Sequence, residues 1–157
     1  MKFAAITAAL LCASGLFVQN SYAQNVDIKD AWVRTSVQGQ KASGAFMTLT
    51  AKQATRLVSI TTPVAGVAQV HEMKMDSDVM RMRALPDGLD LPAGKPVALS
   101  PGGSHVMLMD LKAVLPKDST VPMTLVFKDA QGVESKLEVK LTVATTAPGS
   151  AAAAHSH

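Results

Sequence analysis

Two histidines and six methionines lie within one 39-residue window of this chain, from His71 to Met109. Their imidazole nitrogens and thioether sulfurs are the donors that a soft metal ion such as Cu(I) prefers over carboxylates. The rest of the region that we expect to fold has no other histidine and only two more methionines. If this sequence carries out chemistry, the window indicates that the chemistry is soft-metal binding.

The donor types also indicate how tightly a metal would be held. A cysteine thiolate would bind Cu(I) more tightly, but free thiols oxidise in an oxidising compartment. Methionine is a neutral donor that does not titrate. A site of two imidazoles and two thioethers leaves the +1 charge uncompensated, so it should favour Cu(I) over Cu(II). It should also bind less tightly than a thiolate site, which suits a carrier that must release its metal.

Period-two spacing would place these donors on common faces, because successive side chains on a strand point to opposite sides. Three candidate strands, Val67–Met75, Val79–Ala84 and His105–Lys112, each carry histidine or methionine on one face. The short Asp76-Ser77-Asp78 segment would make the first two a hairpin. The donors on these three faces are His71, Met73 and Met75, then Met80 and Met82, then His105, Met107 and Met109.

A structural interpretation competes with the metal site. Methionine is a flexible side chain that also fills hydrophobic cores, and a single histidine on a strand often has only a structural role. Composition and spacing alone therefore leave a soft-metal site and a methionine-packed core equally open.

The elements that must position the donors are short strands, since no segment keeps a helical period. Runs with period two recur between clusters of Gly, Pro and Asp. Nine such runs favour an antiparallel sandwich or barrel. The nine expected strands are Val26–Arg34, Gly44–Ala51, Arg56–Thr61, Val67–Met75, Val79–Ala84, Val97–Leu99, His105–Lys112, Met123–Phe127 and Lys136–Val143.

The N-terminus is expected to be a secretory signal peptide, residues 1–23. Lys2 precedes an apolar run, and Ser21-Tyr22-Ala23 fits a cleavage site, so we place the cut after Ala23. The run is too short for a comfortable membrane span. Cys12 follows Leu11, where a lipoprotein signal would need a small residue, so we assign it to the removed segment. The sequence predicts a periplasmic protein with no cysteine and no membrane insertion.

Residues 24–144 are expected to form one domain, and residues 145–157 a disordered tail. The tail is rich in Ala, Thr, Pro, Gly and Ser, and such a segment cannot bury enough apolar area to offset its ordering entropy. It ends in His155 and His157. That pair could bind a second copper weakly as Cu(II), and a plain solvated tail is an equally open interpretation.

Charge and composition exclude several functions. The formal net charge is only +3, the basic residues are scattered, and there is one tryptophan, so nothing calls for nucleic acid. A blue-copper electron carrier needs a cysteine thiolate, which the exported chain lacks. Glu72 and Asp76 lie near His71, but no nucleophile–base pair or set of convergent carboxylates is evident. We therefore predict that the protein is not an enzyme.

The pattern resembles the periplasmic Cu(I)-binding chaperones linked to the CuA centre of cytochrome c oxidase. Their motif is His, ten residues, Met, twenty-one residues, His-x-Met. Here ten residues separate His71 from Met82, and His105-Val106-Met107 follows after twenty-two. The extra residue falls where Pro86-Asp87-Gly88 predicts a turn. Further similar words are Ala31-Trp32-Val33-Arg34, Gly44-Ala45-Phe46-Met47-Thr48-Leu49-Thr50 and Leu91-Pro92-Ala93-Gly94.

The resemblance implies a cupredoxin-like antiparallel Greek-key sandwich of eight or nine strands that binds one Cu(I). Its ligands would be His71, Met82, His105 and Met107, carried over by position. Met73, Met80 and Met109 would be supporting or alternative ligands, and Met75 a core or supporting residue.

The resemblance also implies a role in copper delivery. The metal would pass to the copper-bearing subunit of cytochrome c oxidase, directly or with a Sco-type copper protein, and we expect a monomer. Copper buffering or tolerance is one alternative. A sandwich interaction domain whose methionines only pack is the other.

Overall fold

The computed structural model describes residues 25–149, which form ten β-strands. Alternation of buried and exposed side chains accounts for most of them. In β9, for example, Val121, Met123, Leu125 and Phe127 are buried while their neighbours point outward. In chain order the strands are β1 (Val26–Arg34), β2 (Ala42–Ala51), β3 (Thr55–Thr61), β4 (Ala65–Asp76), β5 (Val79–Ala84), β6 (Leu89–Leu91), β7 (Pro96–Leu99), β8 (His105–Leu111), β9 (Thr120–Asp129) and β10 (Glu134–Ala144).

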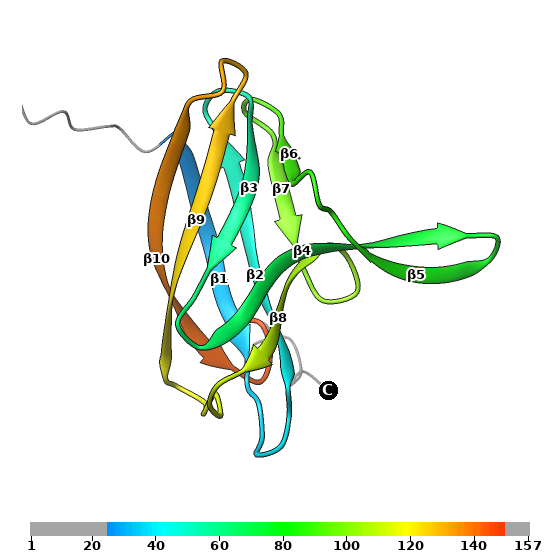
Figure 1. Ribbon diagram of the computed structural model, residues 1–157, viewed down its shortest axis with the longest axis vertical. Helices are drawn as coiled ribbons and strands as arrows, with labels where there is room; N and C mark the ends of the chain where they lie inside the picture. Colours follow the sequence, from blue (N-terminus) through cyan, green and yellow to red (C-terminus); the bar gives the residue numbers. More distant parts are fainter. Residues whose placement is uncertain (1–24, 150–157) are drawn as a thin grey trace, which may run out of the picture.

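The strands form one hydrogen-bonded sheet that folds over on itself. Their order is β5-β4-β8-β2-β1-β10-β9-β3-β6, and β7 pairs with β2. Because β3, near one end of this order, also contacts β4, near the other, the sheet closes into two layers around a core (Figure 1). The all-β sandwich predicted from the sequence is confirmed.

Two details differ from the sequence-based prediction. The nine expected strands are present, but β6 was not anticipated. Its three residues lie between two turn-forming segments and are too few to show a period. The sheet is also not wholly antiparallel, because β1 and β10 run parallel over three residue pairs. These are the first and last strands of the described residues, and sequence periodicity carries no information on their relative direction.

Large aliphatic side chains from most strands fill the core. Leu49, Leu57, Leu108, Leu125 and Leu141 are each at most 1% exposed. In β4 and β8 the core-facing residues are Val70 and Val106, which are directly opposite each other in the register. The histidines that follow Val70 and precede Val106 therefore point to the opposite face, away from the core.

One hairpin projects from this body. The outer part of β4 and nearly all of β5 extend beyond the sandwich as a two-stranded arm, residues 72–83, which ends in the loop at Ser77 and Asp78 (Figure 1). Every residue of β5 is exposed. Ser77 and Asp78 both have positive φ, 47° and 68°, as a two-residue type I′ turn requires.

Several sequence-based predictions fall outside the described residues. These are the signal peptide with its cut after Ala23, the assignment of Cys12, and the terminal pair His155 and His157. Within residues 25–149, no helix has the length and apolar character needed to cross a membrane.

Candidate metal centre

The donor-bearing faces of three strands lie next to one another in the sheet, because β4 pairs with both β5 and β8. His71 of β4 is directly opposite His105 of β8, and Met73 of β4 is directly opposite Met82 of β5. Met107 follows His105 by two residues, so it shares the same face. The register therefore brings all four residues that the resemblance implied as ligands, together with Met73, to one surface.

This surface is hollowed between the arm and the body. A cavity of about 370 Å³, here called the methionine hollow, is lined by Met73, Met82, His105 and Met107. Met82 is 49% exposed, whereas Met73 and Met107 are half-buried. A metal ion held here would be close to solvent on the Met82 side. Its other lining residues are Arg34, Gln40, Ala42, Ser43, Gly44, Phe46, Pro101 and Gly102.

His105 is held in an orientation suited to binding a metal. Its side chain is 8% exposed, and its Nδ1–H donates to the carbonyl of Gly103 at 2.9 Å. A histidine that donates from one ring nitrogen keeps the lone pair on the other, and most metal-binding histidines are oriented by such a bond. This assignment leaves Nε2 of His105 as the donor atom for a soft ion.

His71 lies beside it, with the two ring centroids 6.1 Å apart. Its Nε2 lies 3.4 Å from Gln69 Oε1, to which it can donate. Its Nδ1 is buried and has no hydrogen-bond partner among the described residues. Such an orphaned buried nitrogen is costly, and a bound cation would satisfy it. Burial, followed by the nearby His105, lowers the pKa of His71 from its ordinary value of 6.5, which favours the neutral form that binds metals.

Phe46 of β2 packs near the His105 ring, and Trp32 of β1 packs in turn against Phe46. Trp32 and Phe46 are directly opposite each other, with ring centroids 4.6 Å apart, and Phe46 lies 6.3 Å from the His105 ring. The guanidinium of Arg34 lies 5.3 Å from the centre of the Phe46 ring. Gly44 leaves room for this ring, since a Cβ there would come within 2.8 Å of the Phe46 Cζ.

These supporting residues were not assigned to the site from the sequence. Two segments that resemble the copper chaperones contain Trp32, Arg34, Gly44 and Phe46. That resemblance was the only sequence signal that could have pointed to them. The hydrogen bond to Gly103 could not be predicted from the sequence, because its acceptor is a backbone carbonyl.

Three other methionines lie away from the hollow. Met75 and Met80 are directly opposite each other farther out on the arm. They are 60% and 47% exposed, so Met75 is not a core residue. Met109 lies on the far side of Met107 along β8, opposite Val67 and Ala42, and is not among the residues that line the hollow.

Among residues 25–149, no group of three or more His, Cys, Asp or Glu side chains is arranged to hold a metal ion. The methionine hollow is lined by one histidine, His105, and three thioethers, which are donors outside that set. His71 lies beside His105 but does not line the hollow.

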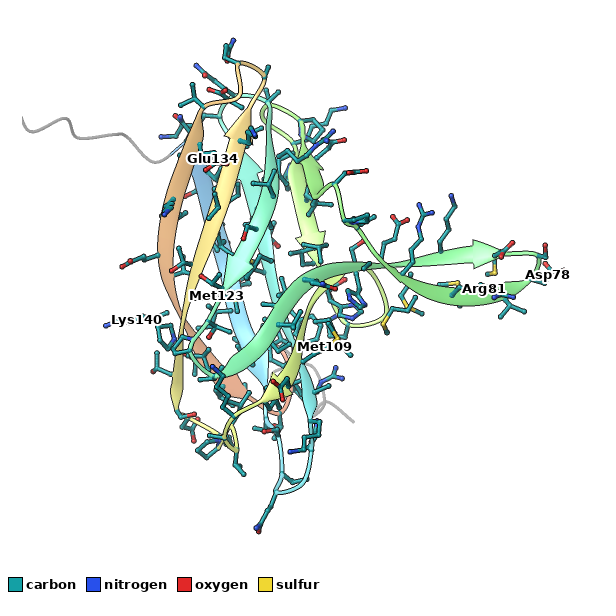
Figure 2. All side chains as sticks on the ribbon, viewed as in Figure 1. Asp78, Arg81, Met109, Met123, Glu134 and Lys140 are labelled. Atoms are coloured by element: carbon teal, nitrogen blue, oxygen red, sulfur yellow. The ribbon has the colours of Figure 1, made fainter. Side chains whose placement is uncertain are left out.

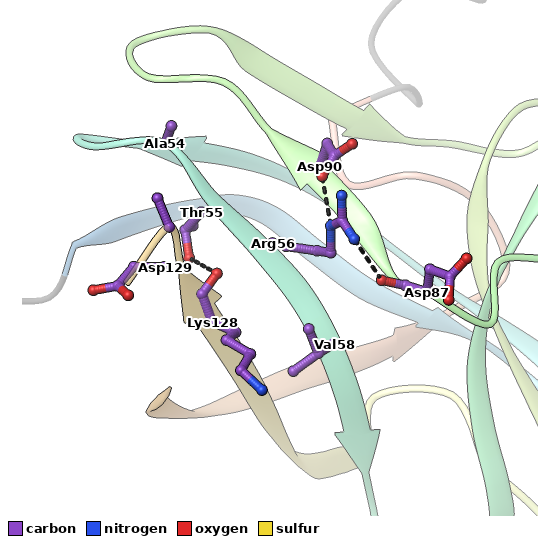
Figure 3. Close-up of a pocket in the computed structure, with 9 residues that line it drawn as sticks. Ala54, Thr55, Arg56, Val58, Asp87, Asp90, Lys128 and Asp129 are labelled. Carbon is purple, nitrogen blue, oxygen red and sulfur yellow. Dashed lines mark hydrogen bonds and ion pairs between the residues drawn. The ribbon is translucent and has the colours of Figure 1, made fainter. Parts of the chain in front are cut away.

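A second, larger hollow of about 470 Å³ lies over β3, β6 and β9 (Figure 3). Arg56 crosses it, with Nε 2.6 Å from Asp90 and a guanidinium nitrogen 3.5 Å from the carbonyl of Asp87. The Asp90 carboxylate raises the pKa of Arg56, so this arginine stays charged and the pair joins β3 to β6. None of the predicted metal ligands lines this second hollow, and it is formed by different strands from those of the methionine hollow.

The sequence is similar to a known protein family and to one of its named relatives. A model of the LpqE-like lipoprotein family matches residues 26–143. Lxx21020 of Leifsonia xyli subsp. xyli (strain CTCB07), which carries a lipoprotein name, is 32% identical over 118 residues, or 75% of this chain and 71% of that protein.

Two solved structures are also similar. The solution structure of CuI-DR1885 from Deinococcus radiodurans is 32% identical, covers 82% of this chain and 85% of its own, and has a TM-score of 0.56. The apo PCuAC domain from PmoF1 is 21% identical, covers 78% and 95%, and has a TM-score of 0.62. These likenesses confirm the cupredoxin-like sandwich that was expected from the sequence.

Proposed function

Because this chain belongs to the LpqE-like family, we propose that it is an exported copper protein that binds one Cu(I) and passes it on. Its ligands are His71, Met82, His105 and Met107, with Met73 as an additional thioether beside Met82. The family membership also supports the prediction that the protein is a binding protein and not an enzyme.

One observation carries this proposal: two imidazoles and three thioethers from three adjacent strands share one face beside one hollow. These donors are neutral and soft, so they suit Cu(I) better than Cu(II). The orphaned Nδ1 of His71 and the free Nε2 of His105 are the nitrogens that such an ion would engage. The Cu(I)-containing structure of DR1885, at 32% identity, supports copper as the metal.

The unequal exposure of the ligands supports transfer over permanent storage. His105 is almost fully buried and oriented by Gly103, whereas Met82 on the arm is half exposed. An incoming donor can replace the Met82 sulfur first, while the histidines still hold the ion. We propose a respiratory oxidase copper subunit or a Sco-type copper protein as the receiver. Export of the chain is supported by the lipoprotein names of its family and of Lxx21020.

Anaerobic Cu(I) titration against a competing chelator tests the site. The wild type should bind one Cu(I), and His71→Ala, Met82→Ala, His105→Ala and Met107→Ala should each bind at least about tenfold more weakly, equivalent to about 1.4 kcal/mol. Met109→Leu, on the same strand but outside the hollow, is the matched control and should bind as the wild type does. Full-affinity binding by all four alanine variants would refute the assignment.

A further inference from the structure

The arm carries a second pair of methionines that the proposed copper site does not use. Met75 and Met80 are directly opposite each other, one step outward from Met73 and Met82. All four point to the same side of the hairpin, here called the methionine face, since they alternate with residues of the other side. Sulfur atoms follow the arm out toward the loop at Asp78 (Figure 2).

The other side of the arm is charged and holds its two strands together. Arg83 pairs with Glu72, and Arg81 Nε lies 3.3 Å from Asp76. With the type I′ turn at Ser77 and Asp78, these pairs set the register of the hairpin. Residues directly opposite in an antiparallel pair have Cβ atoms about 4.5–5.5 Å apart. The flexible Met75 and Met80 side chains can therefore bring both sulfurs to one ion.

Packing does not explain the outer pair. Met75 is 60% exposed and Met80 is 47% exposed on a hairpin that projects from the body (Figure 2). Methionine fills gaps in buried cores, but here it stands at solvent-facing strand positions whose neighbours are charged. Two neutral thioethers held opposite each other are instead a weak ligand pair for a soft cation.

We propose that Met75 and Met80 form an outer site for a soft monovalent cation, from which Cu(I) moves along the methionine face to the inner site. Movement is ligand exchange: a bond from copper to the Met75 or Met80 sulfur breaks as one to the Met73 or Met82 sulfur forms. Copper stays Cu(I), and no proton or electron is transferred. The inward movement rests on the proposed function, whereas binding at the outer pair does not.

Binding is tested by titrating the protein, labelled with ¹³C at its methionine methyl groups, with Ag(I) as a redox-inert probe. The methyl signals of Met73, Met82 and Met107 should shift during the first equivalent. Those of Met75 and Met80 should shift only beyond it, with affinity at least about tenfold weaker because fewer donors contribute. If the Met75 and Met80 signals stay fixed through several equivalents, the outer site is overturned.

The same titration separates the two proposals. Shifts at Met75 and Met80 without shifts at Met73, Met82 and Met107 would overturn the inner copper site while supporting the outer one. Shifts at the inner methionines alone would do the reverse.

The transfer role is tested by stopped-flow measurement of Cu(I) release to a chelator. The double variant Met75→Leu/Met80→Leu keeps apolar side chains of similar volume, so the arm should be retained. It should keep the equilibrium affinity for the first Cu(I). It should release the ion at least about threefold more slowly, because the ion no longer has an intermediate binding site on its way out. Val79→Leu, an exposed change on the charged side of the arm, is the control and should exchange at the wild-type rate. Equal rates in all three proteins would overturn the transfer role.

Discussion

At the scale of the residue, the proposed site divides into candidate donors and the groups that orient them. The candidate donors could be named from the sequence, because thioether and imidazole are uncommon side chains and their period-two spacing assigns them to faces. The orienting groups were not. Phe46 lies about 60 residues before His105 in the sequence. The hydrogen bond that orients the His105 ring is accepted by the backbone carbonyl of Gly103. Only the folded register reveals such partners.

Phe46 provides a first prediction at this scale. Phe46→Ala removes a ring that is 4% exposed and contacts both Trp32 and His105, so it should lower the free energy of unfolding by about 3 kcal/mol. Cu(I) affinity should fall as well, because the His105 ring loses its support. Phe46→Leu retains most of the apolar contact and should cost about 1 kcal/mol. Urea unfolding and chelator competition measure both effects, and equal results for the two variants would contradict this role.

The second prediction concerns pH. Burial lowers the pKa of His71 in the folded protein, so between that pKa and 6.5 the unfolded chain binds more protons than the folded chain. The stability contributed by neutral His71 is therefore complete above pH 6.5 and is lost as the pH falls through the lowered pKa. NMR titration of the His71 ring should give a pKa below 6.5.

Unfolding measured from pH 8 to 5 gives a second check on His71. The free energy of unfolding of His71→Gln, which has no group that titrates there, should fall less with acid than that of the wild type. An equal decrease in the two proteins would count against the burial argument.

At the scale of the element, the proposed site depends on the arm, which carries Met82, and on the turn that follows it. Relative to the spacing that the sequence resemblance implied, the extra residue between Met82 and His105 was expected in the turn at Pro86-Asp87-Gly88. That segment does form a turn, closed by a hydrogen bond from the Gly88 N–H to the Leu85 carbonyl at 3.0 Å. Met73 still lies directly opposite Met82, so the longer turn does not prevent the two methionines from sharing one face of the hairpin.

Gly88 provides the third prediction. It has a φ of +88°, and a Cβ there would come within 2.3 Å of the Leu57 carbonyl oxygen. Gly88→Ala should therefore cost both the positive-φ strain and a backbone clash, about 2–3 kcal/mol in all. Gly94→Ala is the matched control, because its φ is +71° but nothing lies within 4 Å of the added Cβ. It should cost only about 1 kcal/mol.

Thermal or urea unfolding distinguishes the two glycine variants. Equal losses of stability would mean that the close approach to Leu57 does not matter.

At the scale of the whole molecule, the sequence predicted the architecture better than the connectivity. Alternating apolar residues identified nine of ten strands and hence an all-β sandwich. The parallel contact of β1 with β10 brings together strands more than 100 residues apart, which no local pattern records. The projection of the arm was also not predicted. From the sequence alone, methionines on an exposed strand cannot be distinguished from methionines that face a core. The structure distinguishes them, because it shows that the arm extends beyond the sandwich.

The arrangement of the whole sheet leads to the last prediction. Cu(I) bound to the proposed ligands would join β5, β4 and β8, which form one end of the strand order. At a free Cu(I) concentration 100 times Kd, binding should stabilise the fold by about 2.7 kcal/mol. Part of this should appear locally, since an arm that contacts the body mainly at its base opens more readily than the core. Backbone amides of residues 72–83 should therefore gain more protection from hydrogen exchange than those of β9, on the far side of the sandwich. His105→Ala, with the same free Cu(I), should show a clearly smaller local gain, because its weaker binding stabilises the fold less. Uniform protection of β5 and β9 in the wild type would mean that copper does not hold the arm.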